Sequence, residues 1–254
     1  MLFKRKNMKS FLISISFLLA SMVVQAQQAI PYYGQAKTQA HEQMLVRMKE
    51  GKQAERLAAT ANVIVRLSKN LGVGFESCGV VNAYFEPSRN RIVICLEFID
   101  LIREHTQKLD ANSRAAVMSD IIWGLYFHEL AHAVIGINNV PFTGREEDVA
   151  DQFATFLEIE IEKRGVSNRN VTSTVWFWQQ LAKDDRRHNM ADEHSLSGVR
   201  AYNVACWALG ANSKFGLQAS NLIKLPDERR VRCPSEYARL STGVKSIFSR
   251  SLKI

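Results

Sequence analysis

The chain has 254 residues, 46% of them hydrophobic, and a formal net charge of +8. That length suffices for one large domain, or two small lobes, around a well-buried core. No basic stripe with interleaved aromatic residues accompanies the positive charge, so we expect no nucleic-acid partner.

Residues 1–26 have the pattern of a secretory signal peptide. A cationic start without acidic residues precedes an apolar run, and small residues at Val24 and Ala26 define a cleavage site after Ala26. The apolar run is shorter than the roughly 18 residues that indicate a membrane span. Cleavage lowers the net charge from +8 to +4, because the segment holds four of the cationic residues. We expect a periplasmic or secreted protein without stable membrane insertion; an uncleaved N-terminal anchor is the alternative.

The next segments differ in composition. Residues 27–40 are polar and rich in Gln and Ala, which predicts a loose leader. From residue 41 to residue 71, apolar side chains recur at helical spacing, and Gly72 and Gly74 are expected to end this helix.

A β-hairpin is predicted next. Two runs rich in β-branched and aromatic residues, 80–85 and 91–96, flank a turn that contains Pro87. The hairpin brings Cys78 and Cys95 to the same open end, which favours a disulfide between them.

All four cysteines follow the signal segment, and an even count in an exported chain favours disulfides over free thiols. Four cysteines allow three pairings, of which we favour the local one, Cys78–Cys95 and Cys206–Cys233. The second bridge would attach the C-terminal segment to an apolar helix. A four-cysteine zinc site is the rival, but no short-spaced cysteine pair is present.

Helical patterns dominate the remainder. Residues 111–137 predict a long apolar helix, and Thr143 with Glu146 forms a capping-box pattern for a helix ending near Arg164. Further helices are expected at 172–183 and 195–210. The predicted fold is helix-rich α+β with a small antiparallel sheet, in one domain spanning residues 41–244, followed by a frayed basic tail at 245–254.

The central motif is His128-Glu129-Leu130-Ala131-His132. Four-residue spacing puts both histidines on one helix face, so that both rings can reach one ion. Glu129 beside them can take a proton from water that the zinc ion activates. The alternative is a pair of core histidines satisfied by ordinary hydrogen bonds, although burying such groups in an apolar helix without strong partners is costly.

The predicted helix after this motif carries Glu147 and Asp151 on one face. An HExxH helix followed by a helix with Glu-x-x-x-Asp resembles the glutamate-type zincins, such as thermolysin. The resemblance implies a zincin-like fold with a zinc-binding active-site helix and Zn²⁺ held by His128, His132 and Glu147. It also implies that Asp151 hydrogen-bonds to His128 and orients its ring. Glu146 is the competing candidate for the third ligand.

The chain is also similar to a family of predicted bacterial metallopeptidases of unassigned physiological role, over roughly residues 70–240. Outside the zinc motif the resemblance is carried by Cys78, Asn82–Tyr84, Ile94–Glu97, residues 144–152, His194–Leu196, Asn203, Cys206 and Cys233–Pro234.

Two further elements of the site follow from the zincin resemblance. Asn82, Ala83 and Tyr84 resemble the edge strand that binds substrate backbone, with an ordinary hairpin strand as the alternative. His194, two residues after Asp192, is similar to the histidine that is oriented by an aspartate and stabilises the oxyanion. A surface histidine fits the sequence equally well. We expect the other histidines, His41, His105 and His188, to be solvated.

These observations predict an exported zinc metallopeptidase that hydrolyses a peptide or protein substrate, with Glu129 as general base. Two alternatives share the zinc chemistry. One is a catalytically inactive zinc-binding or regulatory module, which the intact Glu129 disfavours. The other is a zinc hydrolase that acts on a non-peptide cell-wall amide.

Overall fold

The computed structural model describes residues 27–165, 171–183 and 193–254. Within these residues one mixed sheet has the strand order β1-β2-β4-β3. Its strands are β1 (Ala29–Tyr33), β2 (Leu71–Glu76), β3 (Ala83–Glu86) and β4 (Arg91–Cys95).

Helices make up most of the described chain. They are α1 (Gln39–Glu50), α2 (Gln53–Ile64), α3 (Leu96–Thr106), α4 (Ala111–Asn138), α5 (Glu146–Lys163), α6 (Val171–Leu181), α7 (Ser197–Gly210), α8 (Gly216–Leu222), α9 (Asp227–Arg230) and α10 (Cys233–Ile247). The fold class is therefore α+β and helix-rich, as predicted. None of the described helices has the length and hydropathy needed to span a bilayer.

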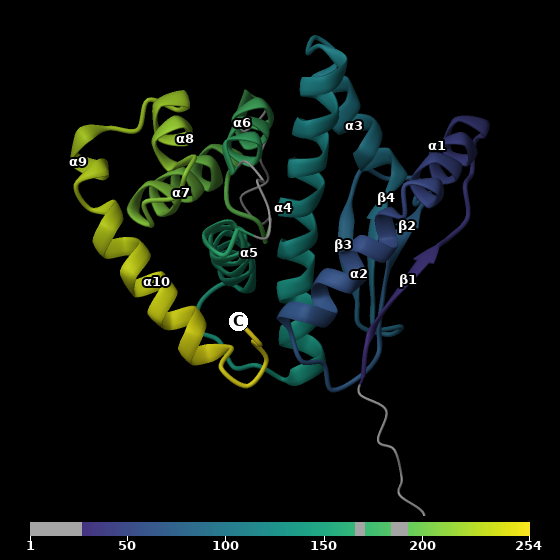
Figure 1. The fold of residues 1–254 in the computed structure, drawn as a ribbon, viewed down its shortest axis with the longest axis horizontal. Coiled ribbons are helices and arrows are strands. Elements are labelled where there is room, and N and C mark those ends of the chain that lie inside the picture. Colours follow the sequence, from purple (N-terminus) through teal and green to yellow (C-terminus); the bar gives the residue numbers. More distant parts are fainter. Residues whose placement is uncertain (1–26, 166–170, 184–192) are drawn as a thin grey trace, which may run out of the picture.

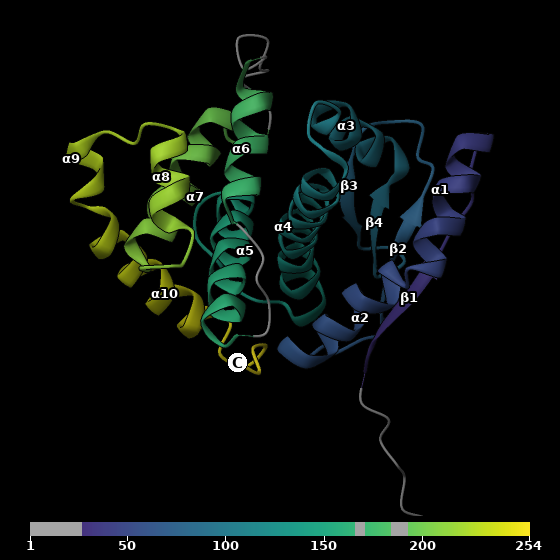
Figure 2. The same cartoon turned by 45° about the horizontal axis from the view of Figure 1, so that its top comes forward.

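The long helix α4 lies between two parts of the molecule. The sheet with α1, α2 and α3 lies on one side, and helices α5 to α10 lie on the other (Figures 1 and 2). Helix α4 packs against β3, β4 and α3 in the first part and against α5 and α6 in the second. Contact on both sides explains why α4 is apolar nearly all round.

The prediction of an antiparallel sheet is wrong for two of its three strand pairs. The hairpin pair β3–β4 is antiparallel as predicted, but β1–β2 and β2–β4 are parallel. Strand β1 lies in the stretch predicted to be a loose leader, and β2 contains both Gly72 and Gly74. A Cβ at Gly74 would lie 2.1 Å from the Tyr32 carbonyl oxygen, so this glycine permits close approach of β1 rather than ending an element.

Two predicted helices differ in their boundaries. The helix expected over 41–71 is divided into α1 and α2 at Gly51–Lys52, where Lys52 has a left-handed φ of 49°. Helix α5 lacks the predicted capping box, because its N-cap is Arg145, which makes no side-chain cap hydrogen bond. The acidic residues of its first turn instead interact favourably with the helix dipole.

The C-terminal segment is packed rather than frayed. Helix α10 continues to Ile247, Phe248 is buried, and Leu252 forms a β-bridge with Val65. Apolar residues spaced along 244–252 explain the difference, since they bury against the core while the basic residues stay exposed.

Both predicted disulfides are confirmed: Cys78–Cys95 and Cys206–Cys233. The first joins the start of the β3 loop to the end of β4. The second joins α7 to the first residue of α10. A bridge of this kind restricts the unfolded chain and stabilises a domain by about 2–4 kcal/mol.

Two glycines in this helical part give a matched test of packing. A Cβ at Gly210 would lie 2.1 Å from the Cys233 carbonyl oxygen, whereas a Cβ at Gly243 would meet no atom within 4 Å. We expect Gly210→Ala to destabilise the protein by about 1–3 kcal/mol, because α7 and α10 must move apart. Gly243→Ala should be neutral or stabilise by up to about 1 kcal/mol. Urea denaturation measures both, and equal effects of the two substitutions would contradict the packing described.

Candidate metal centre

The central turns of α4 carry His128, Glu129 and His132. His128 and Glu129 are each only 4% exposed, and apolar side chains of the same helix surround them. Burial of these ionisable groups requires compensating partners. The hydrogen-bonding partners of the two histidines come from α5, which packs along α4.

Three donor groups converge between α4 and α5. The Nε2 atoms of His128 and His132 lie 3.2 Å apart. The Glu147 carboxylate faces both rings, with Oε2 at 3.0 Å from His128 Nε2 and Oε1 at 3.3 Å from His132 Nε2. The one-turn spacing of the histidines on α4 thus directs both Nε2 atoms to the same carboxylate.

The opposite ring nitrogens are held by two other carboxylates of α5. His128 Nδ1 lies 2.9 Å from Asp151 Oδ1, and His132 Nδ1 lies 2.8 Å from Glu146 Oε1. Glu146, considered as the third ligand from the sequence, therefore contacts the far side of the His132 ring. These contacts fix both ring orientations and leave the Nε2 atoms directed inward.

Arg200 of α7 supports this arrangement, and the sequence analysis assigned it no role. Its guanidinium donates to both oxygens of Asp151, at 2.8 Å from Nε and 2.6 Å from Nη2. It also stacks 3.7 Å from the centroid of the Trp178 ring. Arg200 is 7% exposed. An arginine within the otherwise apolar α7 sequence was the available signal, because a buried guanidinium needs a carboxylate partner.

His194 approaches the centre from the segment before α7. Its Nε2 lies 3.2 Å from Glu147 Oε2, and its side chain is 41% exposed. One ligand atom each from His128, Glu147 and His194 lies within 4.8 Å of the others, a spacing that could hold a metal ion. Asp192, predicted to orient His194, is outside the described residues.

Charges in the site shift the pKa values of its members. Burial lowers the pKa of His128, but hydrogen bonds with Asp151 and Glu147 outweigh it and raise that pKa to about 9. Burial raises the pKa of Asp151, yet Arg200 and His128 hold that pKa well below its usual range. Burial also raises the pKa of Glu147, and His128 and His132 likewise hold it well below its usual range. Burial raises the pKa of Glu129, and the nearby histidines offset this only in part.

The donor set fits a zinc ion. Zinc prefers imidazole nitrogen and carboxylate oxygen in tetrahedral geometry at about 2.0–2.1 Å, which places neighbouring donor atoms about 3.3 Å apart. His128 Nε2 lies 3.2 Å from His132 Nε2 and 3.0 Å from Glu147 Oε2, and the other oxygen of Glu147, Oε1, lies 3.3 Å from His132 Nε2. An ion at this point would displace the proton from Nε2 of each histidine.

Strand β3 borders the candidate site. It is an edge strand of the sheet and pairs with β4 alone within the described chain. Asn82 and Ala83 line two small cavities, of about 250 and 210 Å³, that both reach Glu129 and His194. Tyr84 lines the second. The predicted substrate-binding residues thus lie beside the predicted catalytic ones.

The prediction that His41 is solvated is wrong. It is 5% exposed, and its ring lies 2.6 Å from Ser77 Oγ and 2.9 Å from Asp100 Oδ2. Its charged sequence neighbours face outward because α1 is amphipathic. His105 is half-buried against Phe177, whereas His188 is outside the described residues.

A cluster of imidazoles and one carboxylate, formed by adjacent helices of an α+β protein, is the kind of site found in metal-dependent proteins. The chain belongs to the DUF4344 family, described as "Putative metallopeptidase", whose model matches residues 33–246. Neither the curated proteins nor the solved structures gave a match.

The buried Arg200–Asp151 pair predicts a large stability difference between two arginine variants. Arg200→Leu should destabilise by about 3–5 kcal/mol, because Asp151 loses its principal buried partner. Arg103, whose exposed pair with Asp100 has an N–O distance of 2.6 Å, is the control. Arg103→Leu should cost less than about 1 kcal/mol. Urea denaturation compares the two, and similar losses would argue against a structural role for the Arg200 pair.

Proposed function

We propose that the protein is an exported zinc metallopeptidase that hydrolyses peptide bonds with Glu129 as general base. The observation that carries the proposal is the convergence of His128 Nε2, His132 Nε2 and the Glu147 carboxylate beside the buried Glu129. Membership in the metallopeptidase family supports the same reaction class.

His128, His132 and Glu147 would hold the ion, and Zn²⁺ there would supply Lewis-acid chemistry that polarises a carbonyl and makes water more acidic. Asp151 and Glu146 hold the two rings from behind, so neither histidine needs to reorient on binding. The Arg200 guanidinium keeps Asp151 ionised and fixed, which maintains the direction of the His128 ring.

Glu129 is suited to move the proton. It lines both cavities beside β3 and follows a metal-ligand candidate by one residue, so its carboxylate faces the same cleft. Burial raises its pKa, which makes the carboxylate a stronger base than an exposed glutamate. It would accept a proton from the attacking water and pass it to the leaving amine.

The substrate peptide would lie along β3. An exposed strand edge offers backbone donors and acceptors to an extended peptide, and Asn82, Ala83 and Tyr84 line the same cavity as Glu129. His194 lines the same cavity and has a partly exposed ring that could donate to the developing oxyanion.

Export rests on the N-terminal segment and on the two disulfides. Cleavage after Ala26 would release a chain whose cysteines are all paired, and such bridges persist in oxidising compartments. The peptide or protein substrate would be met in the periplasm or outside the cell.

The ligand assignment is tested by the zinc content of purified variants. We expect about one zinc per chain in the wild type, consistent with one four-coordinate site. Glu147→Ala should lose it, whereas Glu146→Ala and His194→Ala should retain it, because Glu146 contacts the far ring nitrogen of His132 and His194 is not one of the three proposed ligands. Atomic emission measures the metal. Zinc lost from Glu146→Ala but kept in Glu147→Ala would make Glu146 the third ligand, and zinc lost from His194→Ala would contradict the three-ligand set.

The catalytic assignment is tested by Glu129→Gln, which keeps size and removes the base. We expect hydrolysis of a casein or peptide substrate to fall by about 10²–10⁴ in kcat, while zinc content stays unchanged. Parallel assays with peptidoglycan fragments distinguish peptide from cell-wall amide hydrolysis. Undiminished peptide cleavage in Glu129→Gln would refute the proposed role of this residue.

A further inference from the structure

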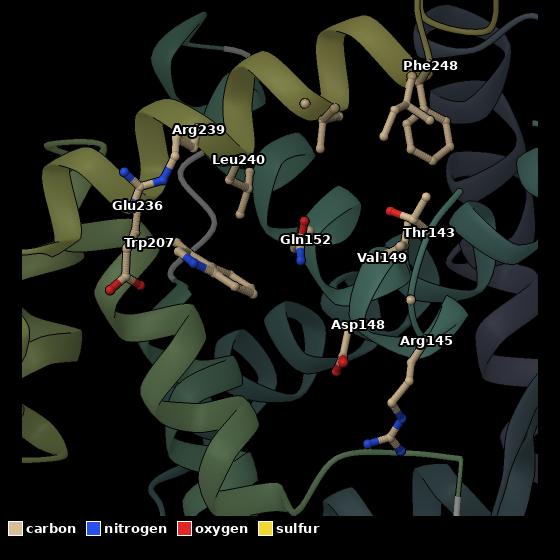
Figure 3. A pocket seen from close by; sticks show the side chains of 14 residues that line it. Thr143, Arg145, Asp148, Val149, Gln152, Trp207, Glu236, Arg239, Leu240 and Phe248 are labelled. Carbon is tan, nitrogen blue, oxygen red and sulfur yellow. The ribbon is translucent and has the colours of Figure 1, made fainter. Parts of the chain in front are cut away.

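A further cavity, separate from those beside β3, lies in the helical part of the molecule. It is a groove of about 520 Å³ between α5 and α10, with Trp207 of α7 at its side (Figure 3). Helix α5 turns Asp148 and Gln152 toward it. Asp148 follows Glu147 by one position, and Gln152 follows Asp151 by one position. Two adjacent rows of side chains on α5 therefore face the metal centre and this groove, respectively.

Helix α10 presents two rows of side chains to the groove. Leu240, Val244 and Phe248 are spaced by four and form an apolar wall. The adjacent row consists of Arg239, Gly243 and Ile247.

Gly243 makes a notch in the second row. A Cβ there would meet no atom within 4 Å, so internal packing does not require glycine. Glycine within a helix costs about 1 kcal/mol relative to alanine. The absent side chain therefore leaves space in the groove. The lower helix stability that glycine brings is not offset by closer packing of the described residues.

Two polar groups of the groove lack a hydrogen-bonding or ionic partner within the part of the chain that the structure describes. Among the described residues, nothing hydrogen-bonds to the side-chain amide of Gln152, and no carboxylate pairs with the Arg239 guanidinium. The acidic side chains are engaged, since Glu236 pairs with Arg229 at 2.9 Å and Asp148 accepts from Ser195 at 2.9 Å. Because Glu236 is already paired with Arg229, the charges left in the lining are those of Asp148, Arg145 and Arg239, an excess of one positive charge.

These features define the chemistry of a ligand. A primary amide can donate to and accept from a peptide group, the wall suits aliphatic side chains, and a free guanidinium suits a carboxylate. From Arg239 to Ile247 the helix extends about 12 Å, the length of about four extended residues. We propose that this groove binds an apolar peptide segment of about four residues whose carboxylate end pairs with Arg239.

The groove adjoins the metal centre through Arg145. This residue lines the groove and also a smaller cavity that contains His132 and Glu147. A peptide bound here would be a part of the substrate remote from the cleaved bond, a role that rests on the proposed peptidase function. Binding itself does not, because no groove residue belongs to the metal site.

The test is calorimetric titration of the purified protein, before and after metal removal by chelation. The probe is acetyl-Leu-Ala-Leu-Leu with a free carboxylate, compared with its C-terminal amide. We expect the carboxylate form to bind and the amide form to bind about tenfold more weakly, a difference of about 1.4 kcal/mol. Arg239→Gln should remove the preference.

Gly243→Leu fills the notch and should abolish binding, whereas Gly243→Ala should retain it. Thermal denaturation checks that both variants are folded. Undiminished binding to Gly243→Leu, or no binding to the wild type, would overturn the proposal. Binding in the groove should also survive in His128→Ala, so failure of the metal assignment and failure of this inference give different results.

Discussion

A carboxylate–guanidinium pair buried between α5 and α7 is the interaction on which the candidate site depends. Both oxygens of Asp151 accept from Arg200, and Oδ1 also contacts His128 Nδ1, so one carboxylate connects three helices. In a low-dielectric interior each of these charges is costly alone, and together they satisfy one another. The Arg200–Asp151 pair holds Nδ1 of His128, which orients the ring so that Nε2 points toward Glu147.

The rest of the fold supplies the surroundings of that network. Helix α4 is covered on one side by the sheet and on the other by α5 and α6 (Figures 1 and 2). The polar side chains of its central turns line the small cavities next to β3. The β3 edge borders these cavities because the hairpin returns to β4 and leaves its other side unpaired in the described chain. The Cys78–Cys95 bridge fixes the loop that leads into β3.

Helix α5 contributes to two sites at once. Its row of Glu147 and Asp151 faces the histidines, and its row of Asp148 and Gln152 faces the groove beside α10. Arg145 and Asp148 also hold the segment that carries His194, through contacts with the Glu193 carbonyl and the Ser195 hydroxyl. One short stretch of helix makes all these contacts, so it connects the metal centre, the His194 segment and the groove.

The sequence alone determined what depends on local spacing. The pairing of His128 with His132, the shared face of Glu147 and Asp151, and the β3–β4 hairpin follow from helix and strand periodicity. The hairpin favours the Cys78–Cys95 bridge, whereas Cys206–Cys233 was favoured as the pairing local in sequence. Tertiary structure decided the rest. The parallel strands β1 and β2 were missed because their register depends on partners distant in sequence, and Gly72 and Gly74 have the local signature of a chain break. Arg200 and the buried His41 have partners 49 and 59 residues away, Asp151 and Asp100. Such pairings are set by how helices pack, because the free energy of a buried charge depends on which opposite charge the fold brings to it.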